Sequence, residues 1–199
     1  MKIYYWCPYL TNIATIKSVL RSAKSVSKYD KSKNSNEISI LNSSGEWDFQ
    51  KKNSSNIKIQ NLCPFSFHKL LPKEGLIRSR LSFLIILMVN FFPLINKIKK
   101  EKPDYLIVHL LTILPIILSP ILSRNTKIIL RISGLPKLTF IRIITWKLFS
   151  RYIYKVTAPT KKTLKFLEKT KIFKKHQISL LRDPAIDKDE ILKNKNLPI

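Results

Sequence analysis

Short apolar runs rich in Ile, Leu and Val recur along the chain and are separated by polar breaks. Runs of this length and composition predict β-strands. They cover residues 2–8, 38–41, 57–62, 103–111, 126–133, 154–157 and 178–181. In the run at 126–133 the residues Ile128, Ile129 and Leu130 are consecutive, a pattern typical of a strand that helices cover on both faces.

Between these runs, apolar residues recur at the spacing of α-helices. This spacing predicts helices at residues 13–26, 78–100, 140–149 and 161–170. Strands and helices therefore alternate through most of the chain, which is typical of a doubly wound parallel sheet with right-handed crossovers. We predict the α/β class, with one Rossmann-like domain over residues 1–186 and a polar, linker-like tail at 187–199.

Several helix ends can be placed from single residues. Thr11 or Asn12 is suited to cap the first helix, and Thr160 to cap the basic helix after it. Thr112 is expected to cap a short helix that carries Pro115 in its first turn. The long apolar helix is expected to kink near Pro93.

Two apolar stretches are candidates for membrane spans. Residues 81–96 are uncharged, but they contain Asn90 and Pro93 and fall short of the ~20 residues that a spanning helix needs. Residues 105–123 are nearly long enough, but two prolines and a histidine interrupt them, and the preceding Lys-Pro-Asp is typical of a turn into a strand. We favour a strand followed by a buried helix there, with a spanning helix as the alternative.

The sequence has a large positive net charge, which bears on the partners that the protein can bind. The 199 residues are 45% hydrophobic and carry a formal net charge of +25. Such a charge favours anionic partners such as nucleic acid, a phospholipid surface or a phosphorylated substrate. A compositional bias toward Lys, Ile, Asn and Ser, with most lysines simply solvated, explains the same charge equally well.

Cysteine and histidine give no sign of a metal or disulfide framework. Cys7 and Cys63 stand in apolar surroundings, so we expect reduced, buried thiols in a cytoplasmic protein. His68, His109 and His176 have no companion ligand at metal spacing, and no metal site is predicted. The first strand is too short and too aromatic for the centre of a signal peptide, so translocation is not expected.

Polar side chains follow the predicted strands at their carboxyl ends, where open parallel sheets place their ligand crevice. Arg131 and Arg182 offer planar donors to a phosphate or carboxylate, and Glu46, Asp48 and Asp183 can accept sugar hydroxyls or a proton. A buried ion pair for Arg131 and a simple turn for Asp183 are the structural alternatives. The predicted substrate-binding residues are Thr11, His109, Arg131, Ser133, Gly134, Thr160, Arg182 and Asp183.

Common nucleotide and hydrolase motifs do not occur in the sequence. The first strand is followed by Cys-Pro-Tyr-Leu-Thr in place of Gly-x-Gly-x-x-Gly, and there is no Walker-type loop and no Gly-x-Ser-x-Gly elbow. This disfavours a dinucleotide dehydrogenase, a P-loop enzyme and a serine hydrolase.

Several short segments together resemble the amino-terminal half of a retaining glycosyltransferase of the two-domain GT-B type, family 4. The segments are Lys2-Ile-Tyr-Tyr-Trp-Cys-Pro, Pro103-Asp-Tyr-Leu-Ile-Val-His109, Lys127-Ile-Ile-Leu-Arg-Ile-Ser-Gly134, Val156-Thr-Ala-Pro-Thr160 and Leu180-Leu-Arg-Asp-Pro184. The resemblance implies that this half binds a sugar acceptor. It also implies that a second domain binds most of a nucleotide-sugar co-substrate, and that no other cofactor is needed. Transfer would take place between them.

The sequence also departs from that family. The paired glutamates eight positions apart that bind the donor are absent, as is the glycine-rich turn after the first strand. The resemblance therefore implies an acceptor domain that a second domain or polypeptide completes, and no catalytic residue is predicted here.

The resemblance and the charge together predict where the protein works. An acceptor on a lipid-linked or cell-surface glycan, as in lipopolysaccharide synthesis, would place it in the cytoplasm at the inner face of the membrane. Lys97, Lys99 and Lys100, behind the long apolar helix, are the predicted contacts with anionic lipid. The alternatives are a non-enzymatic basic module that binds nucleic acid or membrane, and a small integral membrane protein.

Overall fold

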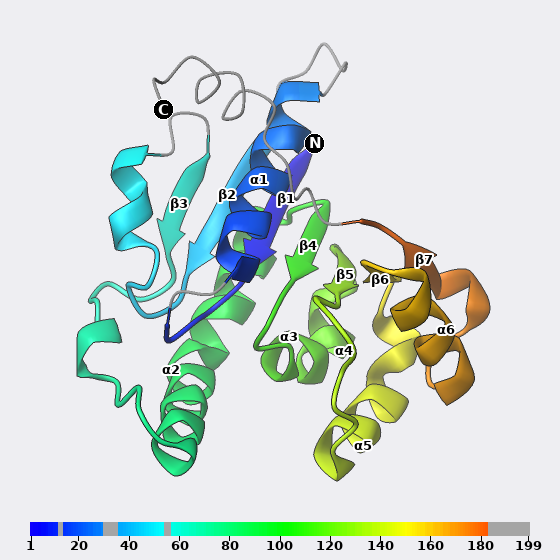
Figure 1. Cartoon of the computed structure of the whole chain (residues 1–199). Helices are drawn as coiled ribbons and strands as arrows, with labels where there is room; N and C mark the ends of the chain where they lie inside the picture. Colours follow the sequence, from blue (N-terminus) through cyan, green and yellow to red (C-terminus); the bar gives the residue numbers. More distant parts are fainter. Residues whose placement is uncertain (12–13, 30–35, 54–56, 183–199) are drawn as a thin grey trace, which may run out of the picture.

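The computed structural model describes residues 1–11, 14–29, 36–53 and 57–182. One sheet of parallel strands runs through the molecule in the order β3-β2-β1-β4-β5-β6-β7 (Figure 1). The strands are β1 (Lys2–Trp6), β2 (Glu37–Asn42), β3 (Lys58–Asn61), β4 (Tyr105–Val108), β5 (Lys127–Arg131), β6 (Lys155–Ala158) and β7 (Ile178–Leu180). The predicted α/β class and Rossmann-like parallel sheet are confirmed.

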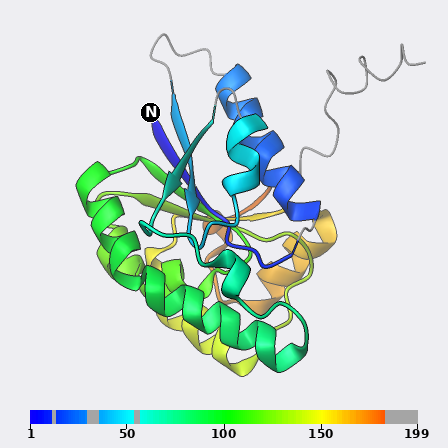
Figure 2. The same ribbon diagram turned by 90° about the vertical axis from the view of Figure 1, so that its left-hand side faces the viewer.

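Helices pack on both sides of this sheet. They are α1 (Ala14–Tyr29), α2 (Leu76–Glu101), α3 (Ile113–Ile117), α4 (Ser119–Leu122), α5 (Phe140–Phe149) and α6 (Lys161–Thr170), with 3-10 turns η1 (Asp48–Asn53), η2 (His68–Leu70), η3 (Ser150–Tyr152) and η4 (Lys175–Gln177). Figure 2 shows α1 and α2 on opposite sides of the sheet. Each predicted strand and each of the four main predicted helices is present, and most strands are shorter than predicted.

The side chains of β1 alternate between the two faces of the sheet and therefore contribute to two hydrophobic cores. Tyr4 and Trp6 face the larger core, which the helices from α2 to α6 share, while Ile3, Tyr5 and Cys7 face the smaller core under α1. Successive side chains of a strand point to opposite faces of the sheet. Because both faces are covered, four of the five residues of β1 are buried, and Ile3 to Trp6 form an uninterrupted apolar run.

Helix α2 is much longer than the strands that it crosses. Its 26 residues rise about 39 Å, whereas a strand of five residues spans about 17 Å. The amino-terminal half of α2 therefore extends past the carboxyl ends of the strands (Figure 1). There it packs on a third small core formed by Leu10, Cys63, Phe67, Leu71 and Ile86. The helix is continuous through Pro93, with no break at the predicted kink.

The two candidate membrane spans have different outcomes. Residues 105–123 form β4 and two short helices, so the predicted strand and buried helical segment are confirmed and the alternative of one spanning helix is wrong. Within the described residues, Ile77–Glu101 of α2 is the one helical stretch long and apolar enough to cross a membrane, with a mean hydropathy of 1.9. A third of its apolar window is buried inside the domain.

The predicted helix caps were partly right. The Thr160 hydroxyl accepts a hydrogen bond from the Thr163 amide at 3.1 Å and caps α6 as predicted. Thr112 occupies the N-cap position of α3 as predicted, but its side chain makes no capping hydrogen bond. Asn12, one of the two predicted caps of α1, lies outside the described residues.

Candidate functional site

The sheet has a topological switch point between β1 and β4. From β1 the chain moves to β2 and β3 on one side, and from β4 it moves to β5, β6 and β7 on the other. The loops that leave β1 and β4 therefore diverge at the carboxyl ends of these strands, which is the edge where open α/β sheets bind ligands.

A row of buried polar side chains crosses the strands beside this switch point. Val108 pairs with Leu130, so His109 and Arg131 follow at the ends of adjacent strands, and Arg131 pairs in turn with Thr157 on β6. All three side chains are buried. We call His109, Arg131 and Thr157 the polar row.

Two members of the polar row have unsatisfied polar atoms. Nδ1 and Nε2 of His109 and Oγ1 of Thr157 are buried and have no hydrogen-bond partner among the described residues. Buried polar groups of this kind are costly and are usually paired. The row is therefore a candidate for binding a polar group supplied from outside the domain.

The electrostatics of the row keep its imidazole neutral. Burial lowers the pKa of His109 from 6.5 to about 3, and the positive charge of Arg131 acts in the same direction. The ring of Tyr5 stacks on the His109 ring with centroids 6.3 Å apart. At neutral pH the row thus combines one fixed cation with a neutral group that can donate from one ring nitrogen and accept at the other.

The backbone after β4 is strained in a way that fixes the position of His109. Leu110 has a φ of +53°, in the left-handed region that residues with a Cβ rarely occupy. The Trp6 indole donates to the Leu111 carbonyl at 2.7 Å, and the His109 amide donates to the Trp6 carbonyl at 2.8 Å. Strain that the surrounding bonds maintain is common at ligand sites.

Other predicted site residues lie along the same edge with different surroundings. Arg131 Nη2 donates to the carbonyl of Arg182 at 3.3 Å, so the two predicted arginines are brought together. Ser133 and Gly134 are exposed just beyond β5, and Thr11 is exposed beyond β1. Thr160 is the cap described above, and Asp183 lies outside the described residues.

The acidic residues after β2 are not available in the way the sequence suggested. The buried carboxylate of Glu46 accepts the amide and the hydroxyl of Ser43 at 3.1 and 2.7 Å, and those of Ser44 at 2.7 Å each. Burial raises the pKa of Glu46, and these hydrogen bonds oppose the rise. Asp48 is bound by Asn42 and Lys51. Both carboxylates therefore hold their own loop together.

Sequence reasoning missed a cluster formed by three separate loops. Ser44 Oγ lies 3.3 Å from His68 Nδ1, and the Ser44 carbonyl accepts the amides of Phe67 and His68. The Tyr9 ring packs edge-on to both His68 and Trp47, and its hydroxyl donates to the Glu46 carbonyl. Burial lowers the pKa of His68, with Lys73 contributing. These residues are far apart in the sequence, so no local motif indicated the cluster.

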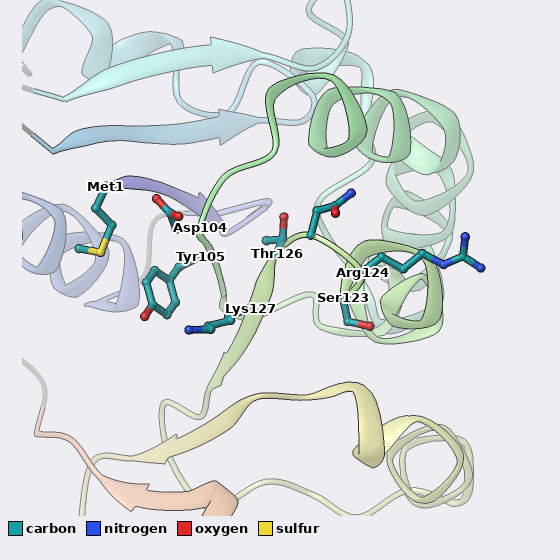
Figure 3. Close-up of a pocket in the computed structure, with 8 residues that line it drawn as sticks. Met1, Asp104, Tyr105, Ser123, Arg124, Thr126 and Lys127 are labelled. Carbon is teal, nitrogen blue, oxygen red and sulfur yellow. The ribbon is translucent and has the colours of Figure 1, made fainter.

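A hollow lies at the opposite edge of the sheet (Figure 3). It has a volume of ≈ 610 Å³ and is lined by the amino-terminal ends of β4 and β5. Two of its polar side chains have structural partners: Asp104 Oδ2 accepts the Lys2 amide at 2.6 Å, and Lys127 Nζ lies over the rings of Tyr105 and Tyr154. Thr126 Oγ1 is buried and has no hydrogen-bond partner among the described residues. Because parallel sheets bind ligands at the carboxyl edge, we assign the site to the polar row.

Metal and redox chemistry find no support in the described part of the chain. No group of three or more His, Cys, Asp or Glu side chains there is placed to hold a metal ion. Cys7 and Cys63 are buried free thiols, as predicted. Burial and the charge of Glu46 raise the pKa of the Cys7 thiol.

No protein-family model matches the sequence, and no curated protein sequence does. Solved structures do match the fold. The UDP-GlcNAc 2-epimerase of Neisseria meningitidis bound to UDP-GlcNAc is 14% identical with a TM-score of 0.61, over 98% of this chain and 50% of its own. The lipopolysaccharide outer core galactosyltransferase WaaB is 13% identical with a TM-score of 0.55, over 92% and 46%.

A third neighbour is HepE of Anabaena in complex with UDP and glucose, 8% identical with a TM-score of 0.54, over 92% of this chain and 44% of its own. The chain thus spans about half the length of the structures that it matches. At these identities the likeness shows the fold, which is that of one half of a GT-B protein.

Proposed function

We propose that this chain is the acceptor-side domain of a glycosyltransferase that moves a sugar from a nucleotide-sugar donor to a lipid-linked or cell-surface glycan. A donor-binding domain or a second polypeptide would complete the active site. The fold supports this, since the chain matches one half of a galactosyltransferase and of a UDP-GlcNAc 2-epimerase. The family-4 retaining class remains a prediction from the sequence.

The observation that carries the proposal is the polar row at the switch point. Unsatisfied imidazole and hydroxyl groups next to a buried guanidinium suit a ligand with several hydroxyls or an anionic group, as a saccharide or a glycan phosphate has. In this proposal Arg131 binds the anionic or most polar group, and His109 and Thr157 pair with hydroxyls. Arg182 and Asp183 would lie at the rim of the acceptor cleft.

A glycan array tests this role directly. We expect the full chain to bind a subset of saccharides and the Arg131→Gln variant to bind them at least about tenfold more weakly, because a charge-assisted bond is lost. Arg124→Gln is the matched control, since Arg124 is exposed at the opposite edge of the sheet. Equal binding by the two variants would remove the polar row from the proposal.

Transfer requires a second measurement, made with the donor-binding partner present. Arg131→Gln and Asp183→Asn should both lower complemented transferase activity while leaving hydrolysis of the nucleotide-sugar donor unchanged. Salt-dependent retention of an oligonucleotide, together with no saccharide binding, would instead favour the basic nucleic-acid module.

A further inference from the structure

The outward face of α2 is apolar along most of its length. Ile77, Leu81, Leu84, Met88 and Phe92 follow one another at intervals of three or four residues, which places them on one side of the helix. All five are exposed, Ile77 by 82% and Met88 and Phe92 by 70% each.

The opposite side of the helix is the one that packs inside the domain. Ser82, Ile86 and Asn90 are completely buried there. The helix of a soluble protein usually carries polar residues on the side away from its core. In this helix the side away from the core is apolar instead.

Helix α5 shows the same arrangement in the same layer. Phe140, 77% exposed, and Ile141, Ile144 and Leu148 are exposed, while Trp146 is buried on the inner side. Helix α2 contacts α4 and α3 contacts α5, so the helices form one continuous layer. A single exposed apolar residue is ordinary, but two exposed rows on one layer indicate an interaction surface.

The charges around these rows are mainly positive, and the acidic residues nearest to α2 in the sequence are Glu74, exposed just before it, and Glu101 at its end. Residues 105–167 contain no Asp or Glu, and α2 contains none before Glu101. Arg78 and Arg80 are exposed in the first turns of α2, and Lys147 is exposed on α5. Lys99, two turns beyond Phe92 and on the same side of α2, is exposed as well.

We propose that the outward rows of α2 and α5, with their flanking cations, form a surface that docks on an anionic lipid bilayer. We call it the α2–α5 surface. Its apolar side chains would enter the boundary between headgroups and acyl chains, and Arg78, Arg80, Lys99 and Lys147 would meet lipid phosphates. The inference deepens the proposed function, because a lipid-linked acceptor would lie in the same bilayer.

This surface shares Lys99 with the contacts that the sequence predicted and otherwise lies elsewhere on the layer. The predicted contacts were Lys97, Lys99 and Lys100. Lys97 is only partly exposed and forms an ion pair with Glu101 at 2.5 Å, so it belongs to the fold. Lys99 and Lys100 are exposed, but the apolar rows lie nearer the amino-terminal ends of both helices.

The packing of α2 favours a helix that lies on the bilayer over one that crosses it. Ser82 Oγ donates to the Pro72 carbonyl at 2.6 Å, and Leu94 and Ile98 are part of the main core. Crossing the bilayer would expose that core, whereas docking leaves every buried contact in place.

Charge also decides between a bilayer and a second copy of the chain. Two α2–α5 surfaces facing each other would bring like charges together, which costs energy and disfavours a dimer through this face. An anionic bilayer offers both the apolar phase and the negative charge that the surface lacks.

Vesicle flotation tests the surface with no glycan present, so it can fail independently of the proposed function. We expect the full chain to float with vesicles made of equal parts phosphatidylglycerol and phosphatidylcholine. Met88→Gln/Phe92→Gln should bind at least about tenfold more weakly, since two largely exposed apolar side chains are lost. Phe49→Gln is the matched control, because Phe49 is 90% exposed on η1 and away from the surface.

The flanking cations can be tested in the same flotation experiment. Arg78→Gln/Arg80→Gln should weaken binding by about fivefold for each charge, and the loss should disappear on pure phosphatidylcholine. Lys161→Gln/Lys162→Gln, two exposed charges on α6, should have a clearly smaller effect.

Three results would overturn the proposal. They are no flotation of the wild-type chain, equal flotation of the Met88→Gln/Phe92→Gln variant, and self-association that this variant abolishes. A nitroxide on Met88→Cys gives an independent depth measurement, because both native thiols are buried. When the protein is bound to vesicles, the label at position 88 should be shielded from water-soluble relaxants. The same label on Phe49→Cys should stay accessible to them.

Discussion

Two groups of buried polar residues lie at the carboxyl edge of this sheet, and they are built in opposite ways. In the loop after β2, Glu46 accepts four hydrogen bonds from Ser43 and Ser44. In the polar row, atoms of His109 and Thr157 have no partner among the described residues. Polar groups that are satisfied inside the domain stabilise it, whereas unsatisfied ones reduce stability and remain available to a ligand.

The largest effect should come from Gly45, which closes the satisfied loop. Its φ is +99°, and a Cβ there would lie 1.7 Å from Ser66 Oγ. We expect Gly45→Ala to lower the free energy of unfolding by about 3–5 kcal/mol, through strain and collision together. Urea denaturation measures the loss.

Gly75→Ala separates the two causes. Gly75 also has a positive φ, of +85°, but a Cβ there would meet nothing within 4 Å. Its cost should be about 1–2 kcal/mol, from backbone strain alone. Equal losses at both glycines would mean that the packing of the β2 loop contributes little.

The next effect concerns His109 and depends on pH. The pKa of His109 is about 3 in the fold and 6.5 ordinarily, so the unfolded chain takes up a proton first as the pH falls. The free energy of unfolding therefore includes the full contribution of the neutral His109 above pH 6.5. As the pH falls from 6.5 toward 3, this contribution decreases by up to about 1.4 kcal/mol per pH unit.

The variant that reveals this dependence is His109→Leu. At neutral pH it should unfold with a free energy equal to the wild type or about 1 kcal/mol higher, because an unsatisfied buried group is gone. Between neutral pH and about pH 5 it should lose less stability than the wild type. Urea denaturation at the two pH values gives the difference, and identical slopes would assign the effect to other groups.

The smallest effect should be a contrast between two hydroxyls. Thr157→Val removes a hydroxyl with no described partner and keeps the shape, so the unfolding free energy should change by less than about 1 kcal/mol. Ser44→Ala removes a hydroxyl bonded to Glu46 at 2.7 Å and should cost about 1–2 kcal/mol. Thermal denaturation of both variants measures the contrast, and a larger cost at Thr157 would show that the row is structural.

Local patterns predicted the fold well because the information was local. Thr160 followed by a basic amphipathic stretch is a complete capping signal, and it marked the start of α6 correctly. The strands were found from runs such as Ile128 to Leu130, since burial on both faces requires apolar residues at successive positions.

The site was harder to predict because its contacts join distant segments. The carboxyl-end rule placed His109 and Arg131 on one edge, but Thr157 looked like an ordinary strand residue. The Ser44–His68 contact depends on how two loops approach each other. Glu46 was taken for a ligand group, although two serines just before it were a local signal that it binds its own loop.

Hydropathy could not show which side of α2 is covered. An apolar helix has the same sequence pattern whether all of its sides are buried or one side is exposed. Only the packing in the structure distinguishes these two cases. The exposed side, and with it the α2–α5 surface, therefore emerged from the structure.

The central pairing of β1 with β4 also bears on how the protein is made. Lys2 and Asp104, bonded at the start of these strands, are 102 residues apart. On the ribosome, β1 must wait for about a hundred further residues to emerge before its second neighbour exists, and closing so long a loop slows folding. Helix α2 emerges directly before β4, when β1, β2 and β3 are the only strands available to cover its inner side, so we expect the nascent chain to benefit from shielding of α2 by a chaperone.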